Sequence, residues 1–259
     1  MKWVFETIAV AFAMFSAVPV PQPIWNEKNM RYALCAFPLV GVVCGVAWFG
    51  WSALAEKLAF PLIFRAAGFC LLPVWLTGGI HLDGYADTCD ARSSYGDMEK
   101  KQKILKDPHC GAFAVIRLCM YFVLWFALCC SFQPAEKGLL CMGLGFVLSR
   151  ALSGLAVASF PLAKNTGLAH TFASAADKKR VKEILLFLTG FLMIWLVKFG
   201  GWNGAAMIFV ALAVFWHYYI VSKKEFGGIS GDLAGWFLQR AEIWMLAALV
   251  ICQLLEAKL

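Results

Sequence analysis

The chain has 259 residues, of which 61% are hydrophobic, and its mean hydropathy is +0.72. Such a composition excludes one or two soluble domains and predicts a single integral membrane domain over residues 1–259. The net charge of +7 does not by itself indicate a nucleic-acid partner, because basic residues in a membrane protein mark one side of the bilayer. We therefore expect lipid contacts and no nucleic acid.

Apolar runs recur along the chain, each near the roughly 20 residues that a membrane-crossing helix needs. They predict an all-α bundle of seven or eight transmembrane helices at residues 3–20, 34–56, 58–80, 111–132, 138–160, 184–200, 202–222 and 240–257. The first and sixth runs are the weakest of these. The first also fits a helix that lies in the membrane interface.

Basic residues are concentrated in the connections that follow the first, third, fifth and seventh runs. The opposite connections and the termini hold only a few: Lys2, Lys57, Lys137, Lys198 and Lys258. The positive-inside rule then places the four polar loops in the cytoplasm and both termini outside. This pattern predicts a multi-pass membrane protein whose conspicuous polar sequence faces one aqueous compartment.

An acidic stretch follows the third apolar run. Asp83, Asp87 and Asp90 are spaced i, i+4 and i+7, so a helix that extends the third span stacks them on one face. Two such charges repel by about 1 kcal/mol in water and by more near a membrane, and a hard cation such as Mg²⁺ relieves that cost. The plainer interpretation is a solvated helix face or a helix cap. The polar loop at about 78–110 is the predicted catalytic segment.

Four further polar residues belong to the candidate site. Asp107 precedes the fourth run and Asp232 the eighth, on the same predicted side, although a lone Asp at a helix start is often only a cap. Arg150 lies inside the fifth run, where it must pair or face a cavity, and Arg suits bidentate phosphate contact. His81 borders the acidic stretch.

Several motifs together resemble one family. The run GGIHLDGYADTCDA and the later ILKDPHCGAF resemble the signature of the cobalamin synthase family, and LSRA, GLAHTF and GGISGDLAGW follow in the same order. Two positions depart from that pattern: Ala91 stands where the family usually has Gly, and Pro108–His109 stand where it usually has Ser-Arg. The candidate carboxylates are all retained.

The resemblance implies a membrane enzyme of cobalamin biosynthesis, located in the bacterial cytoplasmic (inner) membrane with its active-site loops facing the cytoplasm. Such an enzyme joins adenosylcobinamide-GDP to α-ribazole, or to its 5′-phosphate, and releases GMP when the ribazole 3′-hydroxyl attacks phosphorus. The resemblance and the acidic stretch together indicate three groups of site residues. Asp83, Asp87 and Asp107 are expected to be catalytic, and Asp83, Asp87, Asp90 and Asp107 to bind Mg²⁺. His81, Arg150 and Asp232 are expected to bind substrate.

Two other functions remain open at this point. A CDP-alcohol phosphotransferase has a related DxxDGxxAR pattern, but Ala91 replaces its Gly and Arg92 comes too early. A cation transporter also carries intramembrane carboxylates, although those are expected near the bilayer midplane on broken, repeated helices. In this sequence the acids cluster at one rim.

Overall fold

The computed structural model describes residues 2–163 and 167–258, and most of them are helical. Apart from one isolated bridge between Leu162 and Ile229, these residues form no β-structure, which confirms the all-α prediction. The helices, in chain order, are α1 (Lys2–Phe15), α2 (Glu27–Met30), α3 (Ala33–Lys57), α4 (Leu62–Thr77), α5 (Ile80–Ser93), α6 (Met98–Ile104), α7 (Ala112–Ser131), α8 (Glu136–Ser159), α9 (Leu168–Ala175), α10 (Lys178–Gly200), α11 (Trp202–Phe226) and α12 (Gly231–Glu256).

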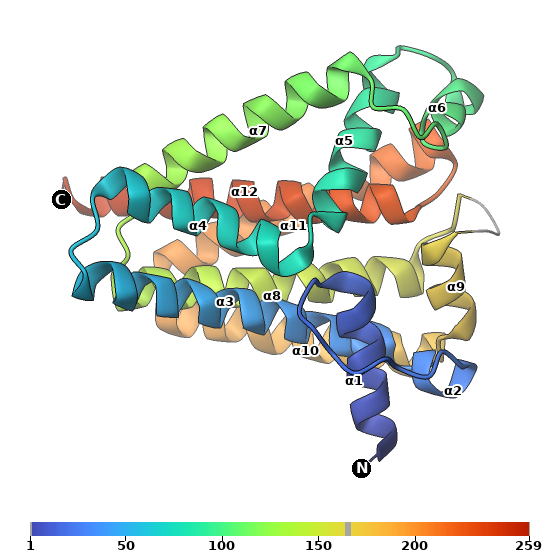
Figure 1. Cartoon of the computed structure of the whole chain (residues 1–259), viewed down its shortest axis with the longest axis horizontal. Helices are drawn as coiled ribbons and strands as arrows, with labels where there is room; N and C mark the ends of the chain where they lie inside the picture. Colours follow the sequence, from blue (N-terminus) through green and yellow to red (C-terminus); the bar gives the residue numbers. More distant parts are fainter. Residues whose placement is uncertain (1, 164–166, 259) are drawn as a thin grey trace.

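The long helices run side by side along the long axis of the molecule (Figure 1). Six of the described helices, α3, α7, α8, α10, α11 and α12, are long and apolar enough to cross a membrane. The bent pair α4 and α5 raises the count to seven at most. A polytopic helical bundle is therefore confirmed, with six or seven candidate spans among the described residues where the sequence predicts seven or eight.

Helix α1 corresponds to the first of the eight predicted spans, and it is too short to be counted among the candidate spans. It has only 14 residues and lies across the long helices (Figure 1). Trp3 Nε1 donates to the carbonyl of Lys28 at 2.9 Å, and the amide of Ala17 donates to the carbonyl of Leu76 at 2.8 Å. Both ends of the segment are thus tied to the same end of the bundle, as in an interfacial helix.

The N-terminal and C-terminal segments contact different parts of the bundle, and the placement of both termini outside the cell stays a prediction. The C-terminal helix ends near the start of α8, where Lys137 Nζ lies 3.3 Å from Glu256 Oε1. The N-terminal segment lies instead near α2.

The basic loops gather at one end of the molecule, as the sequence predicts. Arg31 Nη2 lies 2.7 Å from Asp177 Oδ2, which joins α2 to the start of α10. Glu225 at the end of α11 accepts from Arg92 of α5 and from Lys101 of α6. These ion pairs join the four loops two by two, and the end of the bundle where they lie is called the loop end below.

The acidic segment is helical, but it does not continue α4. Gly78 and Gly79 have φ values of 64° and 77°, a left-handed conformation that glycine adopts without steric cost. The chain turns there by 94° between α4 and α5. Helix α5 then packs across α12 so closely that a Cβ on Gly84 would lie 2.7 Å from the Cα of Asp232. The bend therefore lays the acidic face across the loop end.

Helix α12 begins at Gly231, well before the predicted start at residue 240. The hydroxyl of Ser230 accepts from the amide of Leu233 at 3.2 Å and caps the helix. Arg240 interrupts the apolar run, which hid this first stretch from the hydropathy pattern. As a result Asp232 lies in the first turn of α12 rather than in a loop.

Small residues let the central helices approach closely. A Cβ on Gly41 of α3 would lie 2.4 Å from the carbonyl oxygen of Phe146 on α8, and Gly45 faces Gly143 across the same contact. Such small-residue contacts are typical of helix pairs in membranes. Helix α8 is consequently enclosed by its neighbours, whereas α7 exposes most of its surface.

Candidate active site

The carboxylates of Asp83, Asp87 and Asp90 lie on α5, which has the helical conformation that their spacing predicted. Helix α5 lies beyond the 94° bend, at the loop end. Partial burial, with the negative charges of Asp83, Asp232 and Asp90, raises the pKa of Asp87 to about 6. Asp87 thus carries an unfavourable negative charge at neutral pH, which a cation would relieve.

Asp90 has a structural partner of its own. Its Oδ1 accepts from the amide of Ala114 at 3.3 Å, in the first turn of α7. A Cβ on Gly111 would lie 2.2 Å from Asp90 Oδ2, so a larger residue at this position would displace the carboxylate. The geometry assigns Asp90 to capping α7, and its role as a metal ligand stays a prediction.

An acidic cavity of about 680 Å³ lies between α5 and the start of α7. Asp83, Asp87 and Asp107 all line it, so the structure brings these three predicted residues together. The carboxylate of Asp107 accepts from the amide of His109 at 3.0 Å and lies 2.7 Å from its ring Nδ1. These contacts lower the pKa of Asp107. His109, which departs from the family pattern, therefore holds Asp107 in place.

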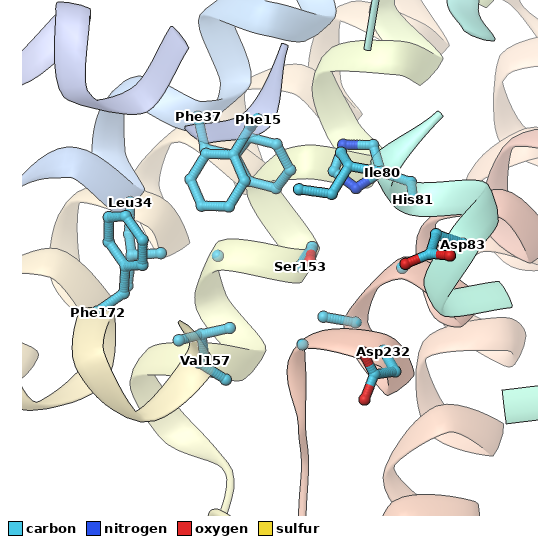
Figure 2. A pocket seen from close by; sticks show the side chains of 15 residues that line it. Phe15, Leu34, Phe37, Ile80, His81, Asp83, Ser153, Val157, Phe172 and Asp232 are labelled. Atoms are coloured by element: carbon cyan, nitrogen blue, oxygen red, sulfur yellow. The ribbon is translucent and has the colours of Figure 1, made fainter. Parts of the chain in front are cut away.

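An apolar cavity of about 140 Å³ adjoins the acidic one at Asp83. Figure 2 shows the rings of Phe15 and Phe37 on one side of it, with the carboxylates of Asp83 and Asp232 on the other. Its further apolar wall comes from Leu34, Val157 and Phe172. The cavity is therefore mainly apolar, with two carboxylates at its rim.

His81 lies at the edge of this apolar cavity, at the start of α5. Its side chain is buried, and burial together with the charge of Arg150 lowers its pKa to about 3. The Nε2 atom is buried without a hydrogen-bond partner among the described residues. A neutral imidazole in this position can accept or donate a hydrogen bond to a ligand but cannot supply a positive charge.

A third cavity of about 230 Å³ continues from the apolar one on the far side of Asp232. Lys106 and His170 contribute its basic groups, and Ser230 and Asp232 line its base. Asp232 therefore lies where the apolar and basic cavities meet. Neither Lys106 nor His170 was among the predicted site residues, although His170 lies in the GLAHTF motif.

Arg150 does not line any of these three cavities. Its side chain and that of Glu242 on α12 are each 1% exposed, and the two form an ion pair. Arg150 Nη1 also donates to the carbonyl of Phe146 at 2.9 Å, and the hydroxyl of Ser149 donates to Glu242 Oε1 at 3.1 Å. The carboxylate accounts for the buried guanidinium, so phosphate contact is not needed to explain it. The opposite charges inside the fifth and eighth apolar runs were the signal for this pair.

The three residue groups predicted from sequence are thus only partly assembled. Within residues 2–163 and 167–258 no three His, Cys, Asp or Glu side chains are arranged to hold a metal ion. Mg²⁺ is usually held by one or two carboxylates and completed by substrate phosphates, which Asp83 and Asp87 can provide for. Magnesium binding therefore stays a prediction with a suitable donor set.

Fold and site define a polytopic helical membrane protein whose carboxylate-lined site lies at one end of the bundle. A family model described as cobalamin-5-phosphate synthase matches residues 7–250. The chain belongs to this family.

Several curated relatives carry one name, adenosylcobinamide-GDP ribazoletransferase. The protein of Lachnoclostridium phytofermentans is 40% identical over 253 residues, covering 98% of this chain and 96% of its own. That of Clostridium botulinum (strain Alaska E43 / Type E3) is 32% identical, covering 94% and 96%. That of Geobacillus sp. (strain WCH70) is 28% identical, covering 95% of each. No solved structure matches the chain.

Proposed function

We propose that this chain joins adenosylcobinamide-GDP to α-ribazole, or to α-ribazole 5′-phosphate, and releases GMP. The observation that carries the proposal is the meeting of an acidic and an apolar cavity at Asp83. A diphosphate and an aromatic nucleoside need these two environments side by side. The position of the carboxylates at the loop end also disfavours a transporter, whose acids are expected near the bilayer midplane.

The apolar cavity suits the base of the acceptor. Its 140 Å³ is close to the volume of about 150 Å³ at which an engineered apolar cavity accepts benzene. The rings of Phe15, Phe37 and Phe172 line it, and aromatic rings pack favourably on one another. We assign this cavity to the heteroaromatic base, with His81 available for a hydrogen bond at its edge.

The acidic cavity suits the diphosphate of the donor. Asp83 and Asp87 would hold Mg²⁺, which would neutralise part of the diphosphate charge. Lys106, in the adjoining basic cavity, offers a further positive charge for a phosphate group. In this arrangement the chain contributes mainly positioning and electrostatics, which dominate phosphoryl transfer.

The acceptor hydroxyl then has a defined set of neighbours. Its oxygen forms a bond to the phosphorus on the cobinamide side, the bond from that phosphorus to GMP breaks, and the hydroxyl proton passes to a carboxylate. The lowered pKa of Asp107 makes it a poor base, because a base works best with a pKa near the working pH. We assign the proton to Asp232, which lies at the rim of the apolar cavity.

We also place the loop end in the cytoplasm of a bacterium and the protein in its inner membrane, because the loop end collects the basic residues. The test uses inverted and right-side-out membrane vesicles supplied with adenosylcobinamide-GDP, α-ribazole and Mg²⁺. GMP and a cobamide are expected from inverted vesicles only. Absence of product with purified protein and any lower-ligand nucleoside would contradict the reaction, and activity in right-side-out vesicles alone would contradict the orientation.

Filling the apolar cavity is expected to weaken acceptor binding selectively. Val157→Phe places a ring in the recess, so we expect the KM for α-ribazole to rise about tenfold or more while the KM for adenosylcobinamide-GDP changes little. Val46→Phe on α3 is the matched control, since Val46 is 65% exposed on the outer surface. Equal KM changes for both substrates would remove the base from this cavity.

A further inference from the structure

A separate basic cavity lies on the opposite face of α5. Tyr85, Cys89 and Arg92 repeat the i, i+4, i+7 spacing of the acidic residues two positions later, which turns them about 200° around the helix. The cavity has a volume of about 320 Å³ and is completed by Ser93, Tyr95, Arg117 of α7, and Trp236 and Arg240 of α12. Three helices thus contribute one arginine each, and none of the described residues that line the cavity is acidic.

The positive charge of this cavity is only partly neutralised. Arg92 Nη2 lies 2.9 Å from Glu225 Oε1, but Glu225 also accepts from Lys101 at 2.6 Å. Neither Arg117 nor Arg240 forms an ion pair within the described part of the chain. An unpaired guanidinium beside a membrane is costly unless an anion reaches it.

Arg240 shows this deficit most clearly. Its guanidinium carbon stacks 4.5 Å from the centroid of the Trp236 ring, and that of Arg92 lies 5.1 Å from the same ring. The stacking holds both side chains in place. The Nη1 atom of Arg240 is nevertheless buried with no hydrogen-bond partner among the described residues. A buried donor of this kind usually has a partner in the functional state.

We propose that this cavity binds a phosphate group. Guanidinium forks match the paired oxygens of phosphate, and the hydroxyls of Tyr85 and Ser93 can donate to the same group. The site does not depend on the proposed transferase reaction. Its phosphate can come from an anionic lipid or from a nucleotide, and both share the chemistry that the arginines recognise.

The surroundings make a lipid headgroup the expected source. Arg117 lies in the second turn of α7, whose Phe113, Ile116 and Met120 are each about half exposed. The cavity is therefore bordered by a lipid-facing helix at the loop end, where the anionic headgroups of a cytoplasmic leaflet would lie. A bound headgroup would neutralise the arginines and hold α5 against α7 and α12.

The test uses the full chain purified in detergent and titrated separately with phosphatidylglycerol, phosphatidylcholine and GMP. Thermal unfolding and native mass spectrometry report binding. Phosphatidylglycerol is expected to raise the Tm of the wild type more than phosphatidylcholine does. Arg117→Gln with Arg240→Gln should weaken that binding about tenfold or more, because each variant removes a charged hydrogen-bond donor. Arg65→Gln is the matched control, because Arg65 lies in the first turn of α4, at the end of that helix away from α5. It should leave binding unchanged.

The outcomes separate the two sources of phosphate. Loss of phosphatidylglycerol binding alone supports a headgroup site, and loss of GMP binding alone supports a nucleotide site. Retention of both kinds of binding in the double variant overturns the proposal, as does a wild type that binds neither probe. If the double variant does not fold, Arg117→Gln alone serves, since Arg117 is an exposed residue whose loss leaves the core intact.

Discussion

Asp87→Asn is expected to lower turnover by roughly 10²–10³-fold or more and, without Mg²⁺, to make the protein more resistant to heat. The first effect follows because the variant removes a carboxylate proposed to hold the diphosphate and its cation. The second follows because burial and neighbouring carboxylates raise the pKa of Asp87 to about 6. The ionised carboxylate of Asp87 therefore destabilises the folded protein, whereas the neutral amide of the Asn variant does not.

The pH dependence of this effect has a definite sign. The folded-state pKa of Asp87 lies above the ordinary value of 3.8, so protonated Asp87 favours the folded state. Metal-free wild-type protein should lose stability as pH rises from about 4 through about 6, while the Asn variant lacks this loss. Thermal unfolding in detergent with a chelator, followed from pH 4 to pH 7, measures the difference.

Asp107→Asn is the matched comparison, because His109 lowers the pKa of Asp107 and reverses the sign. That variant should gain no heat resistance at neutral pH. Near-normal GMP release by Asp87→Asn would remove Asp87 from the site. A metal-free Asp87→Asn protein that melts below the wild type at pH 7 would show that carboxylate repulsion is not what strains the site.

Arg150→Met is expected to destabilise the protein by about 3–5 kcal/mol, the largest stability effect predicted for this chain. The variant leaves Glu242, whose side chain is 1% exposed, as an unpaired charge between α8 and α12. A loss of this size lowers the Tm by roughly 10 °C or more in a chain of this length. Thermal unfolding in detergent measures it.

The double variant Arg150→Met with Glu242→Leu tests the cause. Removing both charges should restore most of the lost Tm, since apolar replacement of a buried pair is often neutral. If the double variant is as unstable as the single one, the ion pair does not explain the effect. A restored Tm together with a raised KM for adenosylcobinamide-GDP would return Arg150 to the substrate site, and an unchanged KM would leave it as a structural residue.

Helical spacing and loop position predicted which residues share the acidic cavity for some site residues and not for others. Asp83, Asp87 and Asp107 line one cavity as expected, because helical spacing and a shared loop end were enough to bring them together. Asp90 shares their spacing, but its contact with Ala114 depends on where α7 begins relative to α5. No periodicity within one segment contains that information.

Sequence alone determined the helices, the acidic face and the basic end, because hydropathy, helical periodicity and loop charge are properties of single segments. Tertiary structure decided which partners those segments meet. The turn at Gly78–Gly79 sets the direction of α5, Glu242 neutralises Arg150, and Phe15, Phe37 and Phe172 come from three helices to form one apolar wall. These contacts join residues far apart in the chain, so packing in three dimensions alone selects them.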